Sequence, residues 1–233
     1  ALTTAQVSAL TTAQWAAITV DDMPAISTAA IQALRTDQVV ALTSQQAASL
    51  TTAQLRALRT DQIQSLVTND LNAFSSAQLR AFSTGQIAAL TTQQVATLGT
   101  GLLSSLSTNQ LAAIETADLR TLSASQMRSL GTDLVVALTT EQVANLTTAQ
   151  IAAMTSAQYA AMETADVAAL TTRQTAVMKT DQIGAFGTQQ LGALNPASLE
   201  ALTPAQFGAL NSAYVLAMTT DQVASLTTAQ IRA

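Results

Sequence analysis

Four aspartates recur in the sequence every 48 residues, at Asp22, Asp70, Asp118 and Asp166. A row of carboxylates could bind cations, but a Ca²⁺ site needs several oxygen ligands that converge on one point. Each 48-residue interval supplies one carboxylate to this series, and Asp21 with Asp22 is the only adjacent acidic pair. An aspartate near a helix N-terminus is also explained as a cap or a dipole partner. We therefore interpret the series as structural and expect no metal site.

Other residue types that perform chemistry are absent or dispersed. The sequence has no Cys and no His, which excludes thiol nucleophiles, disulfides, Cys/His zinc sites and the most common general base. Ser and Thr are abundant but have no adjacent base, and there is no Gly-rich phosphate loop or G-x-S-x-G motif. We expect no enzyme activity, no catalytic residue and no cofactor.

The charge of the chain also restricts its partners. The net charge is −5, and the nine basic residues are scattered along the sequence. A nucleic-acid groove needs clustered Lys and Arg, so we expect no nucleic-acid partner. The longest apolar runs, such as "LVVAL" at 134–138, are too short to span a bilayer. We expect no transmembrane segment.

The sequence is built from one eight-residue unit. A frame that starts at Leu2 divides the chain into 29 octapeptides without insertion or deletion. The consensus is L-T-T-A-Q-V-A-A, and we number its positions one to eight. The search for internal repeats therefore predicts one continuous array over residues 1–233, with no separate domains.

The eight positions differ in a way that separates core from surface. Position one is large and apolar in every unit, and position six is apolar except at Thr175. Position five is Gln in 20 units, and position eight is nearly always Ala or Ser. Arg, Lys and Glu occur only at positions two, four and seven. Positions one and six are therefore predicted to be buried, and the charged positions to face water.

One continuous helix could not bury these columns on one side. Eight residues at about 100° each exceed two turns by about 80°, whereas supercoiling absorbs only about 20° per heptad. The helix must therefore be interrupted in every unit. Such short helices are unstable alone and need stacked neighbours.

The interruption is predicted at positions two and three. Thr at position two followed by Gln at position five matches a capping box, and Pro favours the first helical position. We expect N-caps in "TTAQ", "NPAS" and "TPAQ" at Thr11, Thr51, Thr147, Asn195 and Thr203. Because position three is more uniformly Thr or Ser, the cap assignment stays open by one residue.

These observations predict an all-α solenoid, a superhelix of very short helices with one helix per octapeptide. A β-solenoid is the alternative, although Ala, Gln and Arg at the variable positions are poor strand and turn residues. The 48-residue spacing of the aspartates equals six units. It indicates either a duplicated block or a whole number of coils. Coils of two or three units both fit, and we favour two because alternating helices give the simplest two-sided core.

The array resembles the long LTTAQ(I/V)xAL tracts of very large secreted surface proteins of proteobacteria, most clearly in "TTEQVANLTTAQIAAM" at 139–154. Such proteins are often labelled adhesin or haem utilisation. The haem label has no support in these residues, because His is absent and Tyr159 and Tyr214 stand in different columns. The resemblance implies an extracellular or cell-surface location.

We expect a mechanical function, as an extracellular stalk, spacer or filament that projects or links other domains or cells. Equal units without insertions favour this, since binding surfaces usually carry irregular loops. The alternative is a binding module, an adhesin surface that recognises a protein, a glycan, or a mineral or ice surface through rows of hydroxyls. Neither end carries a polar capping repeat. We therefore expect either flanking domains of a longer chain or self-association into fibres, end to end or laterally.

Overall fold

The computed structural model describes residues 2–210 and 212–232, and each octapeptide there forms one short helical segment. No strand occurs among these residues, and neighbouring helices pack in a repeated pattern. The prediction of an all-α solenoid is therefore confirmed, and the β-solenoid is ruled out. The chain divides into two compact units, Ala1–Thr121 and Leu122–Ala233. The octapeptide frame runs through this division, and the single-array prediction stays a prediction.

The helices of both units are four to six residues long. The first unit contains α1 (Thr4–Ala9), α2 (Thr12–Ala16), the 3₁₀-helix η1 (Met23–Ala25), α3 (Thr28–Gln32), α4 (Thr36–Val40), α5 (Ser44–Ser49), α6 (Thr52–Ala57), α7 (Thr60–Ser65), α8 (Thr68–Asn72), α9 (Ser76–Arg80), α10 (Thr84–Ala88), α11 (Thr92–Thr97), α12 (Thr100–Leu103), α13 (Thr108–Ala112) and α14 (Thr116–Leu119). The second unit contains α15 (Ala124–Ser129), α16 (Thr132–Val136), α17 (Thr140–Asn145), α18 (Thr148–Ala153), α19 (Ser156–Ala161), α20 (Thr164–Ala169), α21 (Thr172–Ala176), α22 (Thr180–Ile183), α23 (Thr188–Ala193), α24 (Pro196–Glu200), α25 (Pro204–Gly208), α26 (Ser212–Ala217), α27 (Thr220–Ala224) and α28 (Thr228–Ile231). The 3₁₀-helix η1 has only three residues.

Helices begin at position three because position two is an extended N-cap. At α6, Thr51 has φ −72° and ψ 157°, and its side chain accepts the N–H of Gln54 at 3.2 Å. The Gln54 Oε1 in turn accepts the N–H of Thr51 at 2.8 Å, which completes the capping box. The structure thus places the cap at position two. The same arrangement is present at the other expected caps that carry Thr, namely Thr11, Thr147 and Thr203.

The fifth expected cap, Asn195, lacks the reciprocal half of the capping box. Asn195 accepts the N–H of Ser198 at 2.8 Å and precedes Pro196, the first residue of α24. Pro204 occupies the same place in α25. Proline is suited to this position because the first helical N–H has no partner within the helix.

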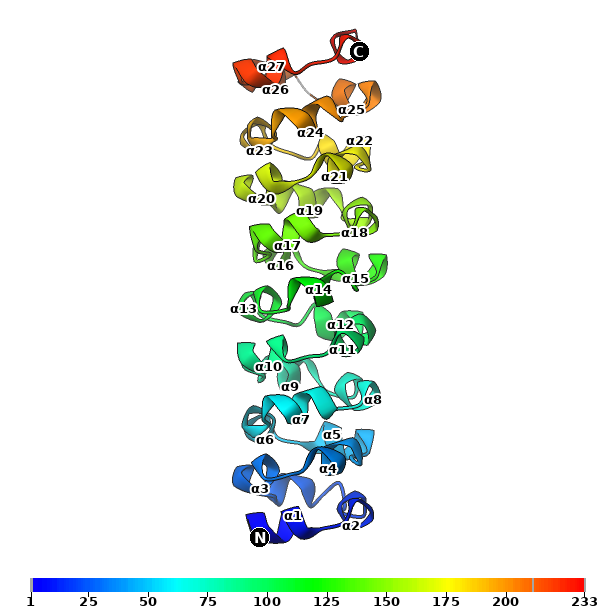
Figure 1. The fold of residues 1–233 in the computed structure, drawn as a ribbon, viewed down its shortest axis with the longest axis vertical. Helices are drawn as coiled ribbons and strands as arrows, with labels where there is room; N and C mark the ends of the chain where they lie inside the picture. The colour runs from blue at the N-terminus through cyan, green and yellow to red at the C-terminus, as the bar shows by residue number, and fades with distance from the viewer. Residues whose placement is uncertain (1, 211, 233) are drawn as a thin grey trace. The chain divides into compact units, whose positions relative to one another are not determined.

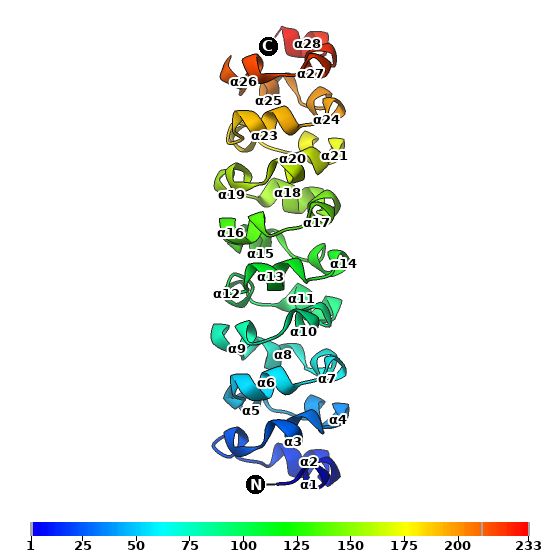
Figure 2. The ribbon, with the colours of Figure 1, turned by 90° about the vertical axis from the view of Figure 1, so that its left-hand side faces the viewer.

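Three octapeptides, or 24 residues, make one coil. In the first unit α3 packs against α6, α4 against α7 and α5 against α8, so each helix contacts the helix three units further along. The second unit repeats this with α15 and α18, α16 and α19, and α17 and α20. Figures 1 and 2 show in two perpendicular views how successive coils lie on one another within each unit.

The preference for two units per coil was therefore wrong. A two-unit coil would require each junction to reverse the chain, and helices that end in a sharp reversal commonly use a residue with positive φ. Among the described residues no residue has a positive φ. The junction instead consists of extended residues such as Leu58, with φ −62° and ψ 135°. These residues redirect the chain without reversing it, and three helices are needed to close a coil.

The core is formed by positions one and six, as the columns predicted. Leu55 and Leu58 represent position six and position one of neighbouring units, and both are buried. Tyr159 at position six follows the same rule, since it is buried and meets Phe186 edge to face with ring centroids 5.5 Å apart. Tyr214 is also buried although it stands at position five. Side chains at position four are exposed, and those at position two are exposed or half-buried. A charged residue at either position therefore keeps contact with water.

Candidate functional site: the helix corners

Buried polar side chains are concentrated at the junctions between helices. We call each junction a corner, and define it by position one, position two and the position-five side chain that folds back over them. Every position-five glutamine from Gln38 to Gln230 is buried. Buried amide groups need hydrogen-bond partners inside the protein, so these side chains must be held by other residues.

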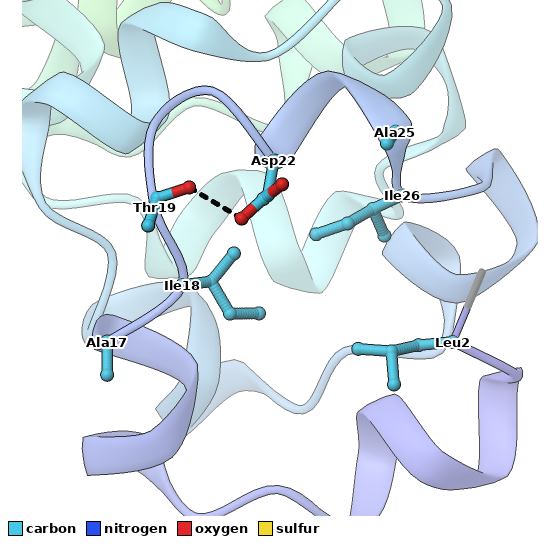
Figure 3. Close-up of a pocket in the computed structure, with 7 residues that line it drawn as sticks. All are labelled: Leu2, Ala17, Ile18, Thr19, Asp22, Ala25 and Ile26. Atoms are coloured by element: carbon cyan, nitrogen blue, oxygen red, sulfur yellow. Dashed lines mark hydrogen bonds between the residues drawn. The ribbon is translucent and has the colours of Figure 1, made fainter.

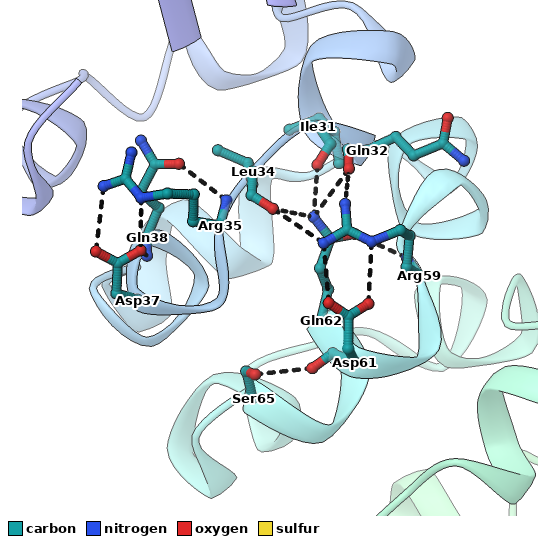
Figure 4. A network of polar contacts seen from close by, with 10 residues as sticks. All are labelled: Ile31, Gln32, Leu34, Arg35, Asp37, Gln38, Arg59, Asp61, Gln62 and Ser65. Atoms are coloured by element: carbon teal, nitrogen blue, oxygen red, sulfur yellow. Dashed lines mark hydrogen bonds and ion pairs between the residues drawn. The ribbon is translucent and has the colours of Figure 1, made fainter. Parts of the chain in front are cut away.

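Gln62 shows what such a side chain does (Figure 4). Its Oε1 accepts the N–H of Arg59 at 2.7 Å, at the N-terminus of α7. Its Nε2 donates to the carbonyl oxygens of Ile31 at 3.0 Å and Leu34 at 2.8 Å, which belong to the coil beneath. These carbonyls lie at and just beyond the end of α3, where helical carbonyls lack partners. One side chain therefore caps two helices and joins two coils.

The same coil-to-coil contact recurs along both units. Glutamine amides donate to carbonyls 31 and 28 residues earlier at Gln38, Gln54, Gln86, Gln94 and Gln110, and again at Gln158, Gln174, Gln190, Gln222 and Gln230. Sequence reasoning found the capping half of this role and missed the coil-to-coil half. A signal was present, since position five stays Gln beside Arg59 and Lys179, which have no hydroxyl for a capping box.

Three of the four recurring aspartates replace Gln at a buried corner. Asp70, Asp118 and Asp166 are 1%, 7% and 3% exposed. Each accepts a hydroxyl hydrogen bond from position three of the coil beneath, from Ser44 at 2.8 Å, Thr92 at 2.6 Å and Thr140 at 3.0 Å respectively. Since six units make two coils, Asp70 and Asp118 lie on alternate coils of one corner.

The fourth aspartate has a different environment. Asp22 is exposed, precedes η1 and accepts the Thr19 hydroxyl at 2.6 Å (Figure 3). It lies beside a hollow whose apolar wall includes Leu2, Ile18 and Ile26. Among the described residues no three acidic side chains come together as a set that could hold a metal ion. The spacing therefore places these carboxylates in one column, but it does not bring them to one point.

The surroundings of Asp70 and Asp166 disfavour the charged form of the carboxyl group. Burial raises the pKa of Asp70, and the hydrogen bond from Ser44 only partly opposes this. Burial also raises the pKa of Asp166, and the nearby negative charge of Glu163 adds to the effect. The Oδ2 of Asp70 is buried and has no hydrogen-bond partner.

Two arginines, Arg35 and Arg59, make a second set of contacts between coils at the exposed side of the corners. Arg59 forms an ion pair with Asp61 at 2.9 Å and donates to the Leu34 carbonyl at 3.3 Å, as well as to the carbonyl of Gln32 (Figure 4). Arg35 makes the corresponding ion pair with Asp37 at 3.0 Å. The arginine partner lowers the pKa of Asp61 below its usual value. These exposed contacts reinforce the contact between coils, although surface ion pairs contribute little to stability.

The two tyrosines serve the packing of the coils. The Tyr159 hydroxyl donates to the Ile151 carbonyl at 2.6 Å, and the Tyr214 hydroxyl to the Leu191 carbonyl at 3.2 Å. Burial raises the pKa of Tyr159, and it raises the pKa of Tyr214 to about 12. Both rings therefore remain neutral phenols that satisfy main-chain carbonyls.

The octapeptide array matches a known repeat family. The family model of the ALTTAQ repeat matches residues 15–52, 64–100, 111–148, 159–196, 185–219 and 199–233. The chain belongs to the ALTTAQ repeat family. The first four matches of this ALTTAQ repeat begin at 15, 64, 111 and 159, close to the 48-residue spacing of the aspartates. A comparison with curated proteins gives no match.

The letters of the ALTTAQ repeat correspond to a complete corner. They run from position eight of one unit to position five of the next, and so include the core Leu, the N-cap Thr and the corner Gln. Among the described residues, no helix has the length and apolar character needed to cross a membrane.

Proposed function

We propose that the ALTTAQ repeats form a non-catalytic structural array, an extracellular stalk, spacer or filament that projects or links other domains or cells. The observation that carries this proposal is a repeated hydrogen bond: a buried glutamine amide in one coil donates to main-chain carbonyls of the coil beneath. Since each coil uses the same contacts, coils can be added without a new kind of interface.

The extracellular part of the proposal rests on composition and on the repeat type. The chain has no Cys that an oxidising compartment could alter and has a net charge of −5. Its octapeptides resemble tracts of secreted surface proteins. The equal length of the units also favours a spacer over a binding module.

Self-association end to end is a second part of the proposal. Glutamine amides make the same contacts between successive coils in both units, as Gln62 does with Ile31 and Leu34. A second copy could continue the array with these same contacts.

Electron microscopy of the purified chain and of a deletion variant tests this proposal. Deletion of residues 76–99 removes one coil and joins position two to position three, so we expect a folded particle shortened by one coil. Deletion of residues 76–95 removes 20 residues, which is not a whole number of octapeptides. This deletion breaks the repeat frame and serves as the disrupted control. A length that does not follow the number of coils would contradict the spacer function.

The same preparations distinguish the remaining possibilities. Fibres that disappear in Ile231→Asp support end-to-end association, whereas fibres that persist in this variant indicate lateral contacts. Single particles at all concentrations contradict self-association. Decoration of a glycan or mineral surface by the full chain would favour a binding module instead.

A further inference from the structure

The corners of α8 and α20 lack a hydrogen bond that the glutamine corners have. A corner Gln donates to the carbonyl 28 residues earlier, as Gln94 does to Leu66 at 2.7 Å. The equivalent carbonyls for Asp70 and Asp166 are those of Leu42 and Leu138. No hydrogen bond to either carbonyl is found among residues 2–210 and 212–232. An ionised aspartate cannot supply it, because a carboxylate only accepts hydrogen bonds.

Apart from one hydroxyl hydrogen bond and the N-terminal turn of α8, the surroundings of Asp70 offer nothing that would compensate a buried negative charge. The side chain is 1% exposed, Ser44 donates to its Oδ1 at 2.8 Å, and its Oδ2 has no partner. The helices packed against α8 are α5 and α11, whose sequences SQQAAS and TQQVAT contain no charged residue. Removing an unpaired carboxylate from water is costly unless the group is neutralised.

Asp166 shares the burial and the single hydroxyl hydrogen bond of Asp70, although in the described part of the chain the buried oxygen without a partner is found only at Asp70. Asp166 also has additional negative charge nearby. It is 3% exposed and accepts the Thr140 hydroxyl at 3.0 Å. The charged residues of α20, its N-cap and the helices α17 and α23 packed on it are Glu163 and Glu141, both negative. Neither could neutralise a carboxylate. Asp118, which is 7% exposed, lies nearer to solvent than Asp70 or Asp166.

We propose that Asp70 and Asp166 each bind a proton in the folded protein, and that the acid O–H fastens the coil to the carbonyl beneath, in place of the glutamine amide. The neutral acid has the one donor and the acceptor that such a corner needs. On deprotonation the proton passes to water, the donor is lost, and a buried charge is left at the corner. The array thus contains two proton-binding corners.

The direction of the pH effect follows from the raised pKa of both groups. A proton held more tightly in the folded than in the unfolded chain stabilises the fold. This stabilisation is complete below the unfolded pKa and is lost as the pH rises through the folded pKa. The corners therefore weaken toward neutral pH, whereas acid weakens most proteins.

A carboxyl ¹³C NMR titration of the full chain tests the protonation directly. We expect the Asp70 carboxyl, assigned by its disappearance in Asp70→Asn, to show the protonated chemical shift at about pH 5, where an ordinary aspartate is ionised. The Asp37 carboxyl, which has an arginine partner, should be ionised at that pH. An ionised Asp70 and Asp166 at about pH 5 would overturn the proposal.

Urea unfolding of the variants supplies a second measurement. Asp70→Asn and Asp166→Asn keep a donor at each corner but cannot ionise. Each should raise the folding equilibrium constant at about pH 8 by roughly tenfold for each pH unit between the folded and unfolded pKa values. Neither should raise it at about pH 3. Asp37→Asn is the control and should not increase stability at about pH 8. Loss of stability at that pH in both corner variants would contradict the inference.

Discussion

At the residue scale, one buried amide carries two functions in this fold. The oxygen of Gln94 accepts the N–H of Thr91 at 2.8 Å, and its nitrogen donates to Ile63 and Leu66 in the coil beneath. A carboxylate has no donor, and the short hydroxyl of Ser198 at position five reaches the Leu170 carbonyl at 3.0 Å but forms no capping box. This explains why Gln is so frequent at position five. The aspartate corners lack this double contact and use a hydroxyl from the coil beneath instead.

The "TTQQ" motif at 91–94 provides a matched test at this scale. Gln94→Met keeps the size of the side chain but leaves the Thr91 N–H and the Leu66 carbonyl without a partner. The Ile63 carbonyl keeps its bond from the Leu66 N–H. We expect a loss of roughly 2–6 kcal/mol in the free energy of unfolding, since each of the two unsatisfied groups costs about 1–3 kcal/mol. Gln93→Met changes an exposed side chain of the same type and should alter stability by less than about 0.5 kcal/mol. Equal effects in urea unfolding would contradict the role given to Gln94.

At the element scale, the helix boundaries follow from local chemistry. Thr147 caps α18 with φ −70° and ψ 155°, and the capping box with Gln150 depends on residues only three apart. The helix starts could therefore be predicted from the octapeptide alone. The number of helices per coil could not, because it depends on how the extended corners direct the next helix and on carbonyls 28 residues away.

Two proline substitutions in α18 test this boundary. Thr148→Pro places proline at the first helical position, as in α24 and α25, after a residue that is already extended. We expect a change in stability within about 1 kcal/mol. Ala152→Pro lies inside the same helix and should cost about 3 kcal/mol or more. Thermal unfolding of both variants checks the difference, and a Thr148→Pro variant as unstable as Ala152→Pro would place the N-cap elsewhere.

The candidate site was predicted in part, for the same physical reason. The columns identified the core, the caps and the 48-residue aspartate spacing, all of which are visible along the sequence. They did not show that Gln62 or Asp70 is buried, because burial at a corner arises only when one coil covers another. The polar character of both residues made an exposed position the simpler expectation.

At the scale of the whole molecule, the central claim is that the chain bends after each octapeptide and closes a coil every three octapeptides. Spin labels at Thr60→Cys and Thr84→Cys, in helices α7 and α10 that pack together, measure this directly in a chain that has no Cys of its own. The account predicts a shorter distance for this pair than for Thr60→Cys and Ser76→Cys, since packed helices lie about 8–10 Å apart. A shorter distance for the second pair would indicate two octapeptides per coil, and a separation of about 36 Å for the first would indicate one continuous helix. Either result would contradict the account.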